Sequence, residues 1–531
     1  MLLKCIHKCL LGSESMACTG FALNSTTSIS LKSGSCLLTS DIIGLIYGCQ
    51  RRSESMTMVR SQNFIGGRWV DPADGARAPI TNPATGTVIG EAAVSSRFDV
   101  DAAVRAAESG WQTWRETTPR ERSEFLFRLA DAMAAHKSDL ADLESANVGK
   151  PILLARGEVD EAIDGLRFFA GAIRGGEGLA SNGFRRGTTS IVRREPVGVV
   201  GLITAWNFPL MGAIWKVGAA LAAGNACVLK PAEQTPLTTL ALAELAAPIL
   251  PPGVLNVLTG QGDPVGSTLA QHPAVRMISV TGAVTTGKAV AAAAAQTLKR
   301  VHLELGGNCP AIVFADADLD AVAAGIRHAA TVNSGQVCLA APRLLVEKSC
   351  YDDFLDRLVP AFESVRVGAP DEGEHIEMGP LAYREHRDRV VGYVQNARNA
   401  KVLTGHLDPN FDSNFVSPTV ITGVEQGDPI VQEEIFGPVV TVQSFDNDAQ
   451  AVEWANGTPF GLAASLWTGD LNRAMSTAPR LEFGTVWMND HLSMLPEMPH
   501  GGVKDSGYGS EGSSYGIDEF TQVKHVWIKH G

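Results

Sequence analysis

The sequence lacks two features that would point to membranes or nucleic acids. No run approaches the roughly 18 consecutive apolar residues of a membrane-spanning helix. Basic residues are in deficit: 44 Lys and Arg stand against 57 Asp and Glu, which gives a formal net charge of −13. An acidic balance of this kind disfavours nucleic acid and anionic membrane surfaces as partners. The sequence therefore predicts neither a membrane protein nor a nucleic-acid-binding protein.

Cysteines with metal-ligand or disulfide spacing are also missing from the main part of the chain. After residue 60 the cysteines are Cys227, Cys309, Cys338 and Cys350, with no regular spacing and no CxxC pair. This pattern disfavours both zinc ligation and a disulfide framework, so no metal site is predicted. Unpaired thiols are typical of a reducing compartment, and we expect a cytoplasmic protein.

Residues 1–57 differ in composition from the rest. They contain only two alanines and show no sustained hydrophobic period. A targeting peptide is one interpretation, because Lys4 and Lys8 flank apolar residues, but the stretch CLLG is too short for the apolar core of a secretory signal. We interpret the segment as a disordered extension that adds nothing to the core, with Met56 or Met58 as an alternative start.

The rest of the sequence alternates regularly between two patterns. A length of 531 residues exceeds what one hydrophobic core usually serves, so two or three domains are expected. From about residue 198, short apolar runs such as VGVVGLITAW and ACVLKP alternate with helical stretches such as LMGAIWKVGAALAAG, which should stop near Gly224. This alternation predicts an α/β fold with a parallel sheet covered by helices.

Polar residues and glycines follow the apolar runs. Asn207 follows the first run, Lys230 and Glu233 the second, and Gly282 and Gly287 the fourth. Ligands of parallel sheets bind beyond the carboxyl ends of the strands. The two glycines would let backbone N–H groups approach a pyrophosphate, or would simply form a tight turn. The Lys–Glu pair could bind the hydroxyls of an adenosine ribose, or could be a surface ion pair.

One carboxylate and one thiol have special surroundings. Glu304 lies in the apolar run RVHLELGG, where an unpaired charge would cost several kcal/mol and where desolvation would raise its pKa towards that of a general base. Cys338 lies in the mostly uncharged stretch NSGQVCLAAPR. By contrast, Cys227 and Cys309 have the surroundings of core residues, and we expect Cys350, in the stretch EKSCYDDF, to lie on an acidic surface that disfavours a thiolate.

Together these stretches resemble the aldehyde dehydrogenase superfamily. The motifs TAWNFP, KPAEQTP, VTGAVTTG, LELGG, NSGQVC, EEIFGPV and PFGLAASLW stand in the order and spacing of that family, from about Phe64 to Trp527. The block that starts at EMPHGGVKDSGYG is most similar to the aminobutyraldehyde and betaine-aldehyde dehydrogenase branch. The resemblance implies the aldehyde dehydrogenase fold: a Rossmann-like cofactor domain, an α/β catalytic domain and a small β oligomerisation arm.

The resemblance also implies roles for individual residues. Cys338 would be the nucleophile that forms a thiohemiacetal and then a thioester, with the Asn207 amide and the Cys338 backbone N–H holding the oxyanion. Glu304 would activate water for deacylation. The cofactor would be NAD, with Glu434 on the nicotinamide ribose and Phe436 against the nicotinamide. The full set of implied cofactor contacts is Thr204, Trp206, Lys230, Glu233, Gly282, Gly287, Glu434 and Phe436.

The family fold implies domain boundaries. Residues 60–177 and 198–306 would bind NAD, residues 307–511 would form the catalytic domain, and residues 178–197 and 512–531 would be oligomerisation segments. The last two contain the alternating stretches GTTSIVRREPVG and FTQVKHVWIKH, whose edges would be exposed unless a partner pairs with them. A homo-oligomer, either a dimer or a tetramer, is therefore expected.

The predicted substrate is an ω-aminoaldehyde such as 4-aminobutyraldehyde. Trp215, Trp487, Asp490 and Glu497 offer aromatic faces and carboxylates that suit an ammonium group. Betaine aldehyde is a close alternative. A general aliphatic or semialdehyde dehydrogenase follows instead if the tryptophans are core and the acids face solvent.

Two further alternatives concern the reaction itself. An inactive structural member of the fold would most simply have lost Cys338, Glu304 or Asn207, and all three are present. A CoA-acylating dehydrogenase typically lacks the base, so Glu304 favours hydrolysis.

Overall fold

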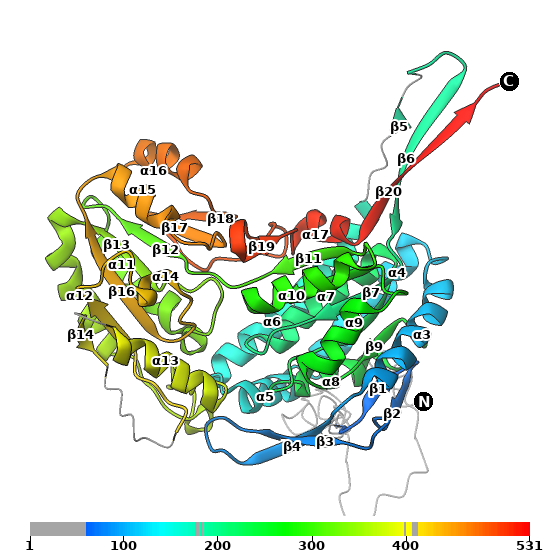
Figure 1. Ribbon diagram of the computed structural model, residues 1–531, viewed down its shortest axis with the longest axis horizontal. Coiled ribbons are helices and arrows are strands. Elements are labelled where there is room, and N and C mark those ends of the chain that lie inside the picture. The colour runs from blue at the N-terminus through cyan, green and yellow to red at the C-terminus, as the bar shows by residue number, and fades with distance from the viewer. Residues whose placement is uncertain (1–59, 176–179, 182–183, 398–399, 406–412) are drawn as a thin grey trace, which may run out of the picture. The chain divides into compact units, whose positions relative to one another are not determined.

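The computed structural model describes residues 60–531 apart from 176–179, 182–183, 398–399 and 406–412 (Figure 1). The predicted extension, residues 1–57, lies outside the described residues. No helix in the described part of the chain has both the length and the apolar content needed to cross a membrane.

The first of two large sheets has eight strands in the order β19-β11-β10-β7-β8-β9-β1-β2. Its five central strands, β11 to β9, run parallel, while β19, β1 and β2 pair antiparallel at the edges. From β7 the chain adds β8 and β9 on one side and then β10 and β11 on the other side. The strand order therefore reverses between β7 and β10. Ligands bind at such a reversal, beyond the carboxyl ends of the strands. The strands are β1 (Asn63–Ile65), β2 (Arg68–Val70), β7 (Val199–Ile203), β8 (Ala226–Lys230), β9 (Leu255–Val257), β10 (Met277–Thr281), β11 (Arg300–Glu304) and β19 (Gly507–Tyr508).

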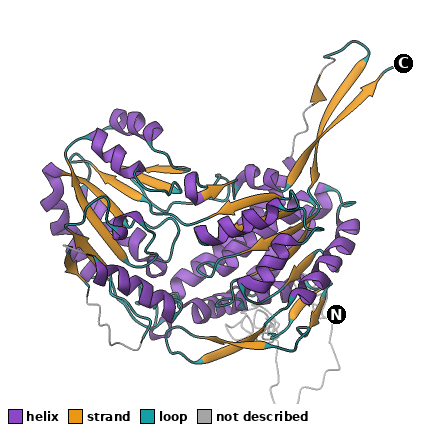
Figure 2. Ribbon diagram, in the orientation of Figure 1, coloured by secondary structure: helices purple, strands orange, loops and turns teal. Residues whose placement is uncertain are grey.

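Helices cover both faces of this sheet (Figure 2). Alternate strand residues point to opposite faces, so Val200 and Leu202 of β7 join one core cluster while Val199 and Ile203 join the other. Helices α4 to α8 pack on the first side, and α3, α9 and α10 on the second. The helices are α3 (Arg97–Trp114), α4 (Pro119–Ala135), α5 (Lys137–Val148), α6 (Ile152–Ala172), α7 (Pro209–Ala223), α8 (Leu237–Ala246), α9 (Ser267–Gln271) and α10 (Val284–Ala295).

Helix α7 ends where the sequence predicts. Gly224 caps the helix with φ 95°, a left-handed conformation that glycine adopts without a steric penalty. The first strand and the helix after it therefore confirm the βαβ pattern expected for this region, and they carry the Asn207 segment between them.

The second large sheet has seven strands in the order β14-β15-β16-β13-β12-β17-β18. All pairs are parallel except β14 with β15. Its strands are β12 (Pro310–Val313), β13 (Arg343–Glu347), β14 (Lys401–Thr404), β15 (Thr419–Thr422), β16 (Val439–Phe445), β17 (Ala463–Trp467) and β18 (Thr485–Met488). The accompanying helices are α11 (Leu319–Thr331), α12 (Tyr351–Glu363), α13 (Arg384–Asn396), α14 (Pro429–Gln432), α15 (Asp448–Asn456) and α16 (Leu471–Thr477).

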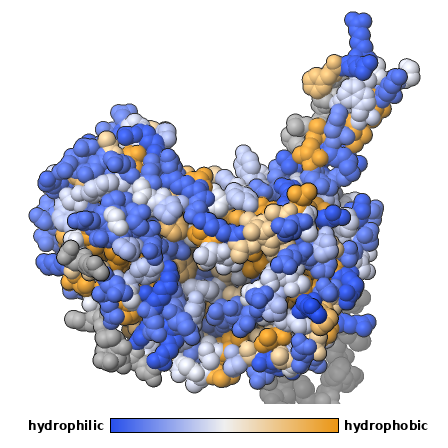
Figure 3. All heavy atoms as spheres, viewed as in Figure 1, coloured by the Kyte–Doolittle hydropathy of each residue, from blue (hydrophilic) through white to orange (hydrophobic). Residues whose placement is uncertain are grey.

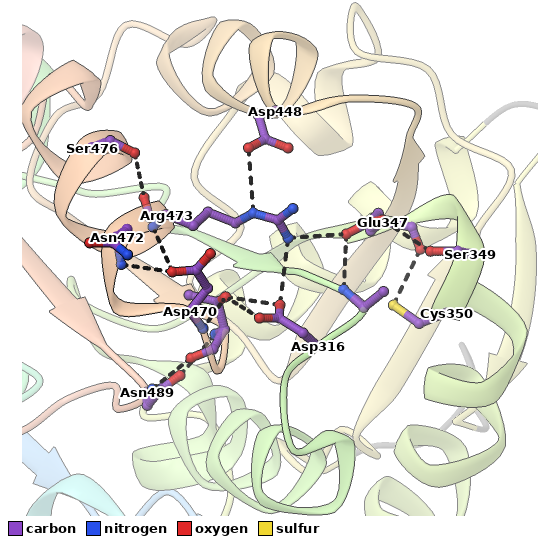
Figure 4. A network of polar contacts seen from close by, with 12 residues as sticks. Asp316, Glu347, Ser349, Cys350, Asp448, Asp470, Asn472, Arg473, Ser476 and Asn489 are labelled. Atoms are coloured by element: carbon purple, nitrogen blue, oxygen red, sulfur yellow. Dashed lines mark hydrogen bonds and ion pairs between the residues drawn. The ribbon is translucent and has the colours of Figure 1, made fainter.

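An arginine on α16 ties this helix to the ends of neighbouring elements (Figure 4). The Arg473 guanidinium lies 3.5 Å from Asp316, 3.7 Å from Glu347 and 3.6 Å from Asp448. Cys350 lies beside this network with its thiol donating to the Glu347 carbonyl at 3.3 Å. The expectation of a surface position for Cys350 is wrong: its side chain is buried, because the following helix α12 packs it against the sheet.

A three-stranded sheet contains the two segments predicted for oligomerisation. Strand β20 (Thr521–Lys529) pairs antiparallel with β6 (Thr188–Pro196) along its whole length, after helix α17 (Ser513–Glu519), and β5 (Ala180–Ser181) completes the order β20-β6-β5. Strand β20 lies at the edge and exposes Val523, among other apolar side chains. Figure 3 shows hydrophobic residues among hydrophilic ones on this ribbon. A separate hairpin joins β3 (Arg77–Thr81) and β4 (Val88–Ala93).

Candidate active site

The Cys338 loop begins with three successive left-handed residues after α11. Asn333, Ser334 and Gly335 have φ values of 48°, 58° and 72°. Non-glycine residues in this region are strained, and such strain is held where surrounding contacts over-determine the backbone. Two contacts do so here: the Ser334 hydroxyl donates to the Gly379 carbonyl at 2.8 Å, and the Asn333 amide donates to the Asn207 carbonyl at 3.0 Å. The loop is therefore held in one conformation.

Asn207 and Cys338 are brought together by this loop. The Asn207 Nδ2 donates to the Gln336 carbonyl at 3.0 Å, two residues before Cys338, and has a second hydrogen. The Cys338 backbone N–H donates no hydrogen bond within the described part of the chain. These are the two donors that the sequence analysis assigned to the oxyanion.

The Cys338 thiol is protonated in this state. Burial raises its pKa well above the ordinary value, and nearby Cys309, Glu304 and Glu434 raise it further. The Cys309 thiol donates to the Cys338 carbonyl at 3.6 Å, and burial raises the pKa of Cys309 to about 12. A proton must therefore leave Cys338 as its sulfur attacks, because the thiolate is the nucleophile.

Glu304 ends strand β11 and is almost fully buried, with 4% of its surface exposed. Burial, and next the Glu511 carboxylate, raise the pKa of Glu304 well above its usual range, as expected from the sequence. Its Oε1 is buried with no hydrogen-bond partner among the described residues. A carboxylate in these conditions is suited to take a proton during a reaction.

Lys230 and Thr204 lie at the carboxyl ends of β8 and β7. Lys230 is buried, and its Nζ donates to the Pro231 carbonyl at 2.9 Å and lies 3.7 Å from the exposed Glu233 carboxylate. The Thr204 hydroxyl is buried without a hydrogen-bond partner in the described residues. An ammonium and an unpaired hydroxyl at adjacent strand ends can bind a hydroxylated or phosphorylated ligand.

The two glycines after β10 have different roles. Gly282 follows the strand, and its N–H donates to the Glu304 carbonyl at 3.1 Å. Gly287 lies inside α10, and its N–H donates to Ala283 at 3.0 Å. Both of these N–H groups therefore have backbone acceptors, so a phosphate at this turn would meet other N–H groups at the start of α10. A Cβ on Gly287 would lie 2.5 Å from Leu305, so this glycine lets the helix pack closely on the chain after β11.

Glu434 lies next to the Cys338 loop. Its Oε1 accepts a hydrogen bond from the Gly307 N–H at 2.8 Å, and burial raises the pKa of Glu434 to about 7. A Cβ on Gly306 would lie 2.3 Å from the Glu434 carboxylate, and a Cβ on Gly307 would lie 2.2 Å from the Cys338 carbonyl. The two glycines therefore allow the Glu434 segment and the Cys338 loop to approach the same stretch of backbone.

Phe436 has a left-handed backbone, with φ 61°. Its ring packs edge-on against Trp206 with the ring centroids 5.3 Å apart, and its carbonyl lies 2.7 Å from the His386 Nε2. These contacts join the end of β7, through Trp206, to the segment that carries Glu434. The predicted cofactor residues from the two large sheets thus lie in one region.

Comparison with known proteins identifies the family. The model of the aldehyde dehydrogenase family matches residues 69–526. The chain is also 39% identical over 485 residues to phenylacetaldehyde dehydrogenase of Pseudomonas fluorescens, an alignment that covers 88% of this chain and 96% of that protein. The chain belongs to the aldehyde dehydrogenase family.

Solved structures agree with this aldehyde dehydrogenase fold. An NAD-dependent aldehyde dehydrogenase from Sinorhizobium meliloti superimposes with a TM-score of 0.87 at 40% identity, covering 90% of this chain and 97% of that one. Betaine aldehyde dehydrogenase from Staphylococcus aureus, in complex with NAD+, gives a TM-score of 0.87 at 34% identity, covering 90% and 96%. The predicted fold class is confirmed.

The aldehyde dehydrogenase is an NAD-dependent oxidoreductase. Its residues fit this cofactor, because the buried Thr204 hydroxyl has no protein partner in the described chain and the Thr204 N–H donates to the carbonyl of Lys230, which ends the adjacent strand. Lys230, Glu233 and Glu434 have the chemistry to hold ribose hydroxyls. Of the two predicted glycines, Gly282 lies in the turn just before α10, and Gly287 lies inside the helix.

A polar group that the sequence did not predict surrounds Glu304. It comprises Lys216 in α7, Ser279 in β10, His302 in β11 and, from the segment after β18, His500 and Glu511. A signal was present, since Lys216 and His302 interrupt apolar runs that form a buried helix and a buried strand. Buried polar side chains need partners, which makes such interruptions informative.

Proposed function

We propose that Cys338, Glu304 and Asn207 oxidise an aldehyde to a carboxylic acid. The Cys338 thiol gives up its proton, with Glu304 as the acceptor, while the sulfur adds to the carbonyl carbon. The resulting oxyanion accepts hydrogen bonds from the second Asn207 amide hydrogen and from the Cys338 backbone N–H. NAD, when bound, accepts the hydride that leaves this carbon, which leaves a thioester on Cys338.

Glu304 then completes the reaction by hydrolysis. Glu304 first passes the thiol proton to solvent, so that its carboxylate can take a proton from a water molecule as the water oxygen adds to the thioester carbon. The Cys338 sulfur then leaves and takes that proton back from Glu304 as the acid is released. The observation that carries this proposal is the buried, unpaired Oε1 of Glu304, since a carboxylate with its pKa raised by burial is a competent base near neutral pH. The same residue favours water over CoA as the acyl acceptor.

The surroundings of Cys338 favour an aldehyde with an apolar substituent. Cys338 packs on an apolar cluster together with Phe208, Trp487 and Met494. A cluster of this kind stabilises an apolar group by roughly 25 cal/mol for each Å² that it removes from water. Phenylacetaldehyde dehydrogenase, a relative, is named for an aldehyde of this type.

The carboxylates needed for an ω-aminoaldehyde have other surroundings. Asp490 is exposed, and its oxygens accept hydrogen bonds from the His491 N–H at 2.8 Å and from the Ser493 hydroxyl. Glu497 is exposed as well, while Trp215 is nearly buried beside His500. The ω-aminoaldehyde predicted from the sequence is therefore our second candidate, supported by the aromatic faces alone.

A direct comparison of aldehydes separates the two candidates. We expect kcat/KM for butyraldehyde and phenylacetaldehyde to exceed that for 4-aminobutyraldehyde by about tenfold. This ratio corresponds to a cost of about 1.4 kcal/mol for moving an ammonium group out of water without giving it a partner. The measurement is the initial rate of NADH formation. Asp490→Asn should leave the ranking unchanged. A higher kcat/KM for 4-aminobutyraldehyde that falls in this variant would favour the ω-aminoaldehyde.

Glu233 is expected to set the cofactor preference. A 2′-phosphate would meet this carboxylate at close range, so we predict a kcat/KM about tenfold higher with NAD than with NADP. Lys230, 3.7 Å away, reduces the preference by offering a positive charge. Glu233→Gln should narrow the ratio, whereas Glu91→Gln, an exposed acid on β4, should not. Equal efficiency with both cofactors in the wild type would contradict this role.

We also propose that the enzyme forms a homo-oligomer in the cytoplasm. The exposed edge of β20 has unpaired backbone groups and apolar side chains, which suits pairing with a second copy. The four cysteines of the described chain are free thiols, which suits a reducing compartment. The domain assignment follows the sheets, except that β19, inside the predicted catalytic range 307–511, pairs with β11 of the first sheet.

A further inference from the structure

Two imidazoles flank the Glu304 carboxylate, one at each oxygen. The His302 Nε2 lies 3.6 Å from Oε1, and the His500 Nε2 lies 3.4 Å from Oε2. The His302 side chain is 1% exposed, so neither this nitrogen nor the facing oxygen has access to bulk water. Each of these two atoms also lacks another hydrogen-bond partner among the described residues. A buried donor and a buried acceptor that face each other and have no alternative are natural partners.

The hydrogen-bond network fixes the direction of the His302 proton. Lys216, which can only donate, contacts the Ser279 hydroxyl at 2.9 Å, and the same hydroxyl lies 2.7 Å from the His302 Nδ1. If Ser279 accepts from Lys216, its own hydrogen goes to Nδ1, which is its other neighbour. His302 then has its proton on Nε2, the nitrogen that faces Glu304. This assignment of the proton gives each buried donor and acceptor in the network one hydrogen-bond partner.

His302 acts in this arrangement as a neutral dipole. Burial and then the neighbouring Lys216 charge lower the pKa of His302 to about 3. The ring is therefore uncharged at any pH at which the enzyme works. A neutral imidazole N–H that points at a carboxylate favours its ionised form without adding a charge to the site.

His500 is held in place by its backbone. Its N–H donates to the Glu511 carbonyl at 2.8 Å, and the Glu511 N–H donates back to the His500 carbonyl at 2.7 Å. The Glu511 carboxylate, 2.5 Å from the Lys216 ammonium, shares the charge of that lysine. The His500 ring lies beside Trp215, with 6.1 Å between the ring centroids. The second imidazole thus has a fixed position at the other carboxylate oxygen.

We propose that His302 and His500 are positioning residues for Glu304, holding its carboxylate between their Nε2 atoms in the orientation needed for deacylation. This proposal rests on the proposed role of Glu304 as the deacylating base. It assigns the Ser279 hydroxyl a specific task, which is to keep the His302 proton on the nitrogen that faces Glu304.

The proposal predicts the direction in which the Glu304 titration moves. The groups that face or surround Glu304 are Lys216 of α7, His302 of β11, His500 and Glu511 before α17, and Glu519 of α17. Burial and the two carboxylates raise the pKa of Glu304, and Lys216 lowers it. Removal of the His302 donor should raise this pKa further, so less carboxylate is present at a given pH. Deacylation then needs a higher pH.

The test compares His302→Leu with His302→Gln, whose side-chain amide keeps an N–H at a similar reach. In His302→Leu we expect the deacylation rate at pH 7 to fall about tenfold and its acid limb to move up by about one pH unit, while the first-turnover NADH burst is retained. Mass spectrometry should show acyl-enzyme accumulating on Cys338. His302→Gln should restore most of the rate and the wild-type profile. His500→Phe, which keeps the ring beside Trp215, should move the limb in the same direction as His302→Leu.

Two serine variants provide a second measurement in case His302→Leu does not fold. Ser279→Ala removes the donor to the His302 Nδ1, so the ring proton is no longer kept on Nε2. The acid limb of deacylation should therefore move to higher pH, as in His302→Leu. Ser465→Ala is the matched control, because its buried hydroxyl also contacts a histidine Nδ1, that of His491 at 2.9 Å, and it should leave the limb in place.

This inference would be overturned if the acid limb of deacylation stayed at its wild-type pH in Ser279→Ala, in His500→Phe and in a folded His302→Leu. An equal shift in Ser465→Ala would also overturn it. A wild-type enzyme that makes no NADH, or whose deacylation shows no acid limb, would instead overturn the proposed function.

Discussion

Cys338→Ala is expected to lower kcat by about 10⁴-fold or more, because the reaction has no other nucleophile to form the covalent intermediate. NAD binding should stay close to wild type, since the predicted cofactor contacts come from strand ends and from the Glu434 segment rather than from the thiol. Steady-state NADH formation measures the first effect, and calorimetric titration with NAD measures the second.

Two buried thiols elsewhere in the chain provide the control for this prediction. Cys350→Ala removes a thiol that lies beside the Arg473 network, and Cys227→Ala removes one from within β8. Both should lower the free energy of unfolding by roughly 1–2 kcal/mol, through a small cavity, and leave kcat within about twofold. Turnover of Cys338→Ala within tenfold of wild type would mean that the nucleophile lies elsewhere.

Glu304→Gln is expected to separate the two halves of the reaction. Glutamine has nearly the shape of glutamate but cannot take a proton from water, so deacylation should slow by about 10²–10⁴-fold. The expected trace is a burst of up to one NADH per active site, followed by a slow steady state. Stopped-flow absorbance records the burst, and mass spectrometry identifies the acyl group on Cys338.

The rate of the NADH burst in Glu304→Gln also tests which group accepts the Cys338 proton. Burial raises the pKa of the Cys338 thiol well above its ordinary value, so the thiol has to lose a proton during attack. If Glu304 accepts it, the burst in Glu304→Gln is also slower than in the wild type. A burst at the wild-type rate would assign this proton to another acceptor, and an unchanged steady state would remove Glu304 from the role of deacylating base.

Local patterns predicted the fold class and the elements around the candidate site. The apolar runs before Asn207 and Lys230 are buried strands, and Gly224 ends α7 in the left-handed conformation. These features depend on neighbouring residues, and therefore on short-range periodicity and on the steric freedom of glycine. Glu304 was predicted to be buried from its strand alone, and the structure confirms this.

Long-range packing decided the features that the sequence did not predict. The sequence indicates a turn at Gly287 but not the close approach of Leu305, which belongs to a different element. Likewise, the contact between His302 and Ser279 depends on the register of two strands, which no local pattern specifies.

The pairing of β19 with β11 has a consequence for synthesis on the ribosome. Gly507 fits against the Leu303 carbonyl and Gly509 against the His302 ring so closely that a Cβ on either would lie 2.1 Å away. The segment that encloses Glu304 is therefore translated about two hundred residues after the strand it covers. A nascent chain that already contains Cys338 and its loop therefore lacks the strand that covers Glu304. On the proposed role of Glu304, we expect hydrolysis to require that β19 has been synthesised and has paired with β11.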